Sequence, residues 1–63
     1  MKNFEKITDF AHHNIYLDYS KLTANLVKRS PDGISTQEMK FKSLQSLYDY
    51  SKTLILEGYS IVF

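Results

Sequence analysis

The stretch RSPDGISTQE, residues 29–38, decides between two folds for this chain. Pro31-Asp32-Gly33 has the composition of a tight turn, which would join two strands of a β-hairpin. The segment 35–38 has instead the pattern of a capping box, in which Ser35 would begin a helix and Glu38 would close its first turn. The first interpretation gives a small α+β domain, and the second gives a mostly α, winged-helix-like protein.

The residues that flank the turn favour the hairpin. A four-residue loop, 30–33, sets Arg29 opposite Ile34 and separates apolar from polar side chains between two strands, 21–29 and 35–42. Such separation is what a sheet with one buried face requires. One face would carry Leu22, Ala24, Leu26, Met39 and Phe41, and the other would carry Thr23, Asn25, Arg29, Thr36, Glu38 and Lys40.

The segments before the hairpin show two different periodicities. Phe4, Ile7 and Phe10 recur at helical spacing behind Asn3, which predicts a short helix over 3–12. Apolar and polar residues then alternate over 15–19, which is typical of a strand. The alternation changes phase near Ser20, so a continuous strand through this point would need a β-bulge.

The segments after the hairpin predict a long helix and a final strand. Ser43 is suited to cap a helix over 43–57, and Gly58 is suited to end it. The predicted inner stripe of this helix consists of Leu44, Leu47, Tyr48, Ser51, Leu54 and Ile55. Residues 59–63 then form a β-branched and aromatic strand, which a right-handed crossover would place parallel to 35–42 and beside 21–29. The resulting fold has one long amphipathic helix packed on the sheet and leaves an open sheet edge.

The turn, the segment ISTQEM and the later TLILEGY together are loosely similar to winged-helix regulators, which implies DNA binding. The similarity covers about half of the chain and has three departures. The segment between Met39 and Leu47 is too short for two helices and a turn, only five residues follow Gly58, and the recognition-helix segment has no arginine.

Length and composition indicate one small domain, 1–63. The chain has no cysteine, so disulfides and zinc–thiolate sites are excluded, and its net charge of +1 is not the basic excess typical of nucleic-acid-binding proteins. Apolar runs are too short to span a membrane, and the N-terminus has no signal-peptide pattern, so a cytoplasmic location is predicted. So small a core favours self-association.

No set of residues has the spacing of a catalytic, cofactor-binding or metal site. His12 and His13 are adjacent and therefore diverge on either a helix or a strand. Asp9, Asp18 and Asp49 have no fixed mutual spacing, and the chain has no glycine-rich phosphate loop. We therefore expect a protein that is not an enzyme and has no cofactor.

Two sets of residues are candidates for binding. Tyrosines and exposed apolar residues are typical of protein interfaces, and this partner-binding set is Tyr16, Tyr19, Tyr50 and Leu56. Basic residues near the hairpin could contact phosphates, and this set is Lys21, Lys28, Arg29, Lys40 and Lys42. The predicted function is a non-enzymatic protein-interaction module that binds itself or a larger host protein, such as a phage or mobile-element accessory protein that modulates its host. The alternative is a small nucleic-acid-binding regulator that uses the basic hairpin or a reduced winged helix.

Overall fold

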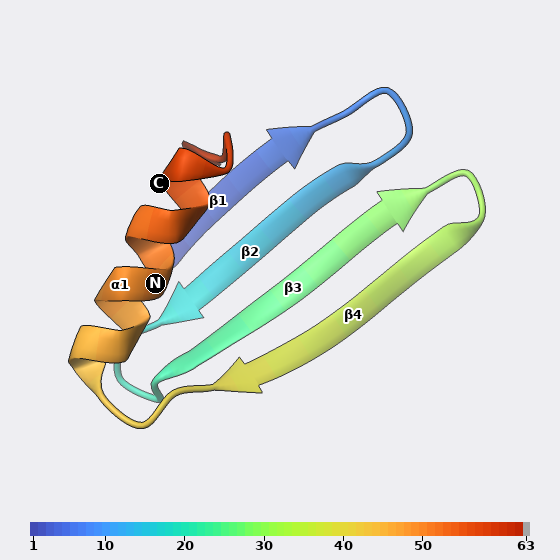
Figure 1. Ribbon diagram of the computed structural model, residues 1–63. Helices are drawn as coiled ribbons and strands as arrows, with labels where there is room; N and C mark the ends of the chain where they lie inside the picture. The colour runs from blue at the N-terminus through green and yellow to red at the C-terminus, as the bar shows by residue number, and fades with distance from the viewer. Residues whose placement is uncertain (63) are drawn as a thin grey trace.

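The computed structural model describes residues 1–62, which form a five-stranded antiparallel sheet and one helix (Figure 1). The sheet order is β4-β3-β2-β1-β5, so consecutive strands are neighbours apart from β5. The elements in chain order are β1 (Lys2–Ile7), β2 (His12–Asp18), β3 (Thr23–Ser30), β4 (Gly33–Lys40), α1 (Leu44–Leu56) and β5 (Ser60–Ile61). The coarse prediction of a small α+β domain is confirmed, but strands make up 50% of the chain and the predicted set of elements is wrong.

The hairpin at residues 29–38 is present in the predicted register. Arg29 lies opposite Ile34, and Ala24 lies opposite Met39. The turn is tighter than predicted, because Ser30 and Gly33 also pair and leave only Pro31 and Asp32 between the strands. Gly33 has a φ of 135°, a conformation that favours glycine. Ser35 therefore lies inside a strand and begins no helix, so the winged-helix alternative is wrong.

The predicted N-terminal helix over 3–12 is wrong, because most of this segment is strand β1. Phe4 is 1% exposed and lies opposite Ile15 of β2 and Ile61 of β5. A helix of ten residues is marginal in water, whereas β1 pairs with β2 at six positions and buries Phe4 in the core. The Thr8 hydroxyl accepts the Ala11 amide at 3.1 Å and so stabilises the turn into β2.

A second turn, between β2 and β3, takes the place of the predicted bulge near Ser20. The Asp18 carboxylate accepts the Ser20 amide at 3.0 Å and the Lys21 amide at 3.2 Å. Leu22 then adopts a φ of 55°, which is uncommon for a residue with a side chain. The change of phase in the sequence thus marks a chain reversal, and β2 and β3 pair antiparallel.

Helix α1 is shorter than predicted and covers only one end of the sheet. Its Ser43 hydroxyl accepts the Ser46 amide at 3.2 Å as an N-cap, and Glu57 is the C-cap. Leu47 and Leu54 are its buried residues, whereas Leu44, Tyr48 and Ile55 of the predicted stripe are exposed. The core therefore lies between α1 and strands β1, β2 and β3, and it consists of Phe4, Ile15, Leu17, Ala24, Leu47 and Leu54.

The last strand is also placed differently from the prediction. β5 pairs antiparallel with β1, not parallel with the strand at 35–42 or beside 21–29. The chain folds back sharply after α1, because the Tyr59 amide donates to the Leu54 carbonyl at 3.0 Å and Gly58 has a φ of 96°. The predicted strand 59–63 includes Phe63, which lies outside the described residues.

Candidate functional site

β4 is the most exposed of the four long strands, and one of its edges is unpaired. Seven of its eight residues are exposed, and Met39 is the exception. Figure 1 shows β4 at the margin of the sheet that lies opposite α1. Neither face of β4 is covered by another element over most of its length, because α1 packs on the β1 side of the sheet.

The outward backbone groups of β4 belong to alternate residues. The Phe41 amide donates to the Leu22 carbonyl at 2.8 Å, so Phe41 faces β3. In an antiparallel ladder the backbone amides and carbonyls of every second residue point toward the same neighbouring strand. Those of residues 35, 37 and 39 therefore point toward β3, like those of Phe41. The amides and carbonyls that point away from the sheet are those of Ile34, Thr36, Glu38 and Lys40. A row of this kind is a template for another β-strand.

A shallow hollow lies beside this edge, on the face that carries α1. It has a volume of about 190 Å³, and its apolar lining comes from Ile15, Leu26 and Tyr59. The hollow exists because α1 does not extend over the half of the sheet near the hairpin turns. Other hollows, of about 310 and 340 Å³, open at those turns and have more polar than apolar lining. Pockets for small molecules have volumes of about 300–1,000 Å³ and a mostly apolar lining. The first hollow is smaller than this and the other two are more polar, so these depressions suit a surface contact better.

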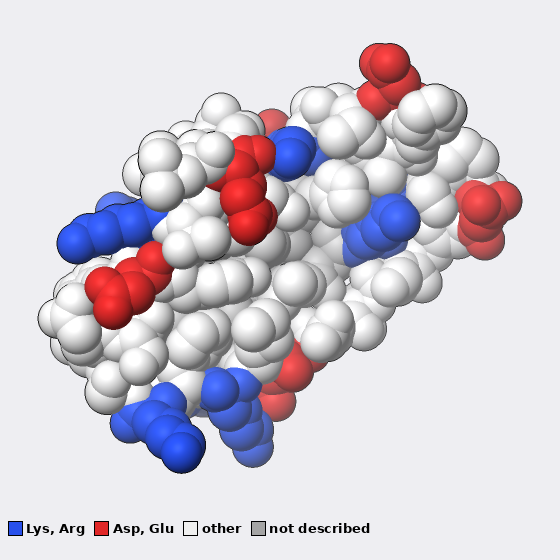
Figure 2. Space-filling model, viewed as in Figure 1, with Lys and Arg blue, Asp and Glu red and all other residues white. Residues whose placement is uncertain are grey.

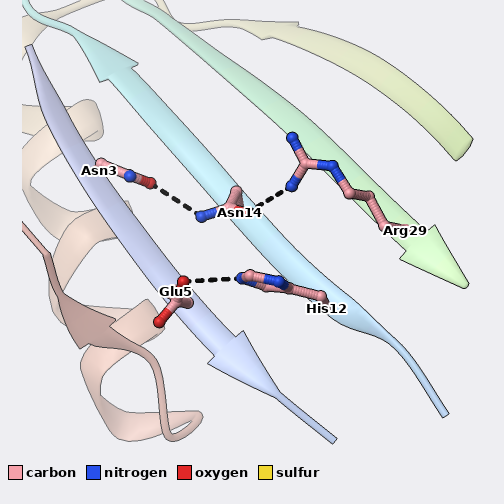
Figure 3. A network of polar contacts seen from close by, with 5 residues as sticks. All are labelled: Asn3, Glu5, His12, Asn14 and Arg29. Carbon is pink, nitrogen blue, oxygen red and sulfur yellow. Dashed lines mark hydrogen bonds and ion pairs between the residues drawn. The ribbon is translucent and has the colours of Figure 1, made fainter.

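The opposite face of the sheet carries a hydrogen-bonded polar network (Figure 3). Asn14 donates to the Asn3 side-chain oxygen at 3.2 Å and accepts from Arg29 at 3.0 Å. Glu5 and His12 form an ion pair of 2.7 Å on the same face. Asn3 and Asn14 are 7% and 4% exposed, and this network provides the partners that buried amides require. The arrangement therefore stabilises the sheet.

The four residues of the predicted partner-binding set lie in different parts of the molecule. Tyr19 packs against Tyr48, with ring centroids 5.4 Å apart, and Tyr50 packs against Phe41 at 5.2 Å. Burial raises the pKa of both Tyr19 and Tyr50 above the usual value for a phenol. Leu56 is 88% exposed on α1, and Tyr16 lies two strands away from β4. The structure does not bring these four side chains together on one surface.

The predicted basic set is also divided between separate places. Directly opposite residues of a sheet share a face, so the pairing places Lys28 on the α1 side and Arg29 on the other. Lys40 lies on the edge strand, and Lys21 and Lys42 lie outside the strands. Figure 2 shows basic and acidic side chains interspersed over the face in view. The face in view therefore has no continuous basic stripe of the kind that follows a nucleic-acid backbone.

Sequence reasoning identified an open edge but missed the apolar residues near the hairpin turns. Ile7, Phe10 and Ile34 are 69%, 83% and 70% exposed. The spacing of Phe4 and Ile7 predicts the apolar face of a helix, whereas Ile7 is exposed at the end of strand β1. Among residues 1–62 no helix is long and apolar enough to cross a membrane, and no three metal-ligating side chains gather in one place. Comparison with protein-family models, curated proteins and solved structures finds no match for this chain.

Proposed function

We propose that this protein is a non-enzymatic interaction module that binds a partner protein by adding the partner's strand to the free edge of β4. The observation that carries the proposal is the row of outward backbone groups on β4, with seven of eight residues exposed. Main-chain hydrogen bonds provide affinity in this mode of binding, and side-chain contacts provide specificity.

The surroundings of β4 support the same function. The exposed residues of β4 leave room for a strand and its side chains, and the hollow beside Leu26 of β3 adjoins this surface. The scattered basic residues give the nucleic-acid alternative less support than the edge gives to protein binding. An accessory role, in which the module modulates a larger host protein, remains a prediction of the sequence.

A proline substitution on β4 tests this function. Thr36→Pro removes an outward amide and leaves the hydrogen bonds to β3 in place, because Thr36 does not face β3. Thr36→Val keeps the amide and has a similar shape, so it is the matched control. We expect proteins that cross-link to the wild type and to Thr36→Val in the native cell to be lost with Thr36→Pro.

Two results would contradict the proposal. One is equal cross-linking by Thr36→Pro, provided that circular dichroism shows a folded sheet in that variant. The other is a wild-type chain that binds no protein at all, including another copy of itself.

A further inference from the structure

We propose that the strand that adds to β4 belongs to a second copy of this chain, with Met39 directly opposite Met39 of the second copy. This inference rests on the proposed function, because it names the partner that uses the same edge. The two β4 strands would run antiparallel about a two-fold axis through Met39. The ladder would extend over residues 36–42 of each copy, with Thr36 opposite Lys42 of the second copy.

The alternation of outward groups limits the registers that two copies can adopt. Hydrogen bonds form only if an outward residue of one copy lies opposite an outward residue of the other. The outward residues of β4 are Ile34, Thr36, Glu38 and Lys40. The two-fold axis of a symmetric pair must therefore pass through a residue and not between two residues. Near the middle of β4 and toward its C-terminal end, this residue can be 36, 37, 38 or 39.

The charges on β4 select one of these registers. An axis at Glu38 sets two glutamates opposite each other, and an axis at Gln37 sets Glu38 opposite Thr36. An axis at Thr36 sets Glu38 opposite Ile34. Only an axis at Met39 sets Glu38 opposite Lys40, and symmetry then provides this ion pair twice. Opposite charges that lie directly across a sheet are attractive, whereas like charges repel.

Both charges are available for this contact. Among residues 1–62 the one ion pair joins Glu5 and His12, so neither Glu38 nor Lys40 has an ionic partner in this part of the chain. Glu38 and Lys40 are both exposed, and they lie on the face of the sheet opposite α1. Met39, on the α1 side, is half-buried, and its pairing would cover the remaining apolar surface near the axis.

Pairing in this register gives one continuous sheet across the two copies. Directly opposite residues share a face, so both α1 helices would lie on the same side of that sheet. The two-fold axis lies near the end of β4 that packs against the core, so the uncovered β3–β4 turn of each copy would project away from the other copy. The dimer thus pairs the part of the exposed edge around Met39 and reduces the aggregation hazard of the isolated chain.

The same two charges could instead protect the edge from association, and the two roles have opposite consequences. Charged residues on an edge strand often discourage pairing with other chains. If Glu38 and Lys40 act in that way, replacing both by alanine strengthens self-association. If they form the proposed ion pairs, the same double replacement weakens it.

Charge reversal measured by analytical ultracentrifugation tests the proposal. We expect the wild type to dimerise, and Glu38→Lys or Lys40→Glu to raise the dissociation constant by about tenfold or more, since two attractive pairs become repulsive. The double variant Glu38→Lys/Lys40→Glu exchanges the charges and should return the constant to within about threefold of the wild type, because the pairs form again in reverse. Lys52→Glu, an exposed site on α1, is the control for net charge and should leave dimerisation unchanged.

An NMR experiment on a mixture of labelled and unlabelled chains tests the register. Met39 of both copies would form a pair without direct hydrogen bonds, in which the two Cα atoms lie about 4.5 Å apart. We expect an intermolecular Hα–Hα signal from Met39. A signal between Gln37 and Gln37 of the second copy, in place of the one between the two Met39 residues, would place the axis at Gln37 and overturn the register.

Other outcomes separate this inference from the proposed function. A wild-type chain that stays monomeric at about 1 mM, the dissociation constant of a very weak complex, would overturn the inference. If cross-linking to other proteins still depends on Thr36 in that case, the proposed function stands. If no protein binds the β4 edge, both are overturned.

Discussion

Leu47 and Leu56 are two leucines of α1 with opposite surroundings. Leu47 is 0% exposed and packs in the core, whereas Leu56 is 88% exposed. We expect Leu47→Ala to lower the free energy of unfolding by about 2–5 kcal/mol, because it leaves a cavity. That loss equals most of the stability of so small a domain, about 3–5 kcal/mol, so the variant should be largely unfolded. Leu56→Ala is the control and should change the free energy of unfolding by about 0.5 kcal/mol or less in urea denaturation.

Asn14 stabilises the sheet through its two hydrogen bonds. Asn14→Ala would remove the donor to the Asn3 oxygen and the acceptor for Arg29, while Asn3 remains buried. We expect a loss of about 1–3 kcal/mol, because a buried polar group without a partner is costly. In a double-mutant cycle with Asn3→Ala, the double variant should lose less stability than the sum of the two single losses, by at least about 0.5 kcal/mol. Additive losses would show that the Asn3–Asn14 contact contributes nothing.

Asp18 should titrate below the usual value for an aspartate. The Ser20 hydroxyl and the Lys21 and Ser20 amides donate to its carboxylate, which lowers the pKa of Asp18 from 3.8. Since the pKa is lower in the folded state, the contribution to stability is present above pH 3.8 and is lost as the pH falls through the folded pKa. An NMR titration should give a midpoint below 3.8. In Ser20→Ala the midpoint should rise toward that value, and an unchanged midpoint would contradict the assigned cause.

At the scale of the elements, β4 differs from the other long strands because only one of its edges is paired. At low protein concentration we expect amide hydrogens at 35, 37 and 39 to exchange slowly, since they face β3. The amides of Ile34, Thr36, Glu38 and Lys40 should exchange faster in the same sample, by NMR-detected hydrogen exchange. Uniform protection along β4 at low concentration would contradict a free edge.

The elements also differ in how much their sequences reveal. The hairpin and its register could be predicted, because alternation on both sides of Pro31-Asp32-Gly33 agrees in only one alignment. The α1 cap at Ser43 could be predicted because it is a local interaction. The segment 3–12 could not, because Phe4, Ile7 and Phe10 match a helix as well as a strand, and the strand gains its stability from residues far away in the sequence.

The whole molecule is elongated, with extents of 35 × 20 × 17 Å, because the β3–β4 hairpin projects beyond the cover of α1. The candidate site results from this incomplete cover. The sequence predicted an open edge and placed Glu38 and Lys40 on the polar face of the hairpin. The sequence could not show that α1 covers only the part of the sheet near β1 and β2. The position of α1 on the sheet depends on the direction that the chain takes after β4.

Association at β4 should link the stability of the fold to protein concentration. When only the folded chain dimerises, mass action stabilises it. At protein concentrations at which the dimer predominates, we expect the melting temperature of the wild type to rise by about 3–5 °C for each tenfold increase in concentration. Glu38→Lys should show a smaller rise in scanning calorimetry. A melting temperature that is independent of concentration in both proteins would contradict coupled dimerisation.

The sequence by itself determined the interactions between close neighbours. These are the turn at Pro31-Asp32, the alternation on both sides of it and the capped helix that begins after Ser43. Each depends on backbone preferences or side-chain periodicity within a short segment, so each is visible in a single sequence.

The tertiary structure alone decided where those parts lie relative to one another. It made residues 2–7 a strand, placed β5 beside β1 and left one edge of β4 unpaired. The physical reason is that a strand has no stability without its partners, and the burial of Phe4 between β2 and β5 depends on residues at both ends of the chain. Which strand has an unpaired edge is therefore a property of the complete sheet, and the unpaired edge of β4 is the one proposed to bind.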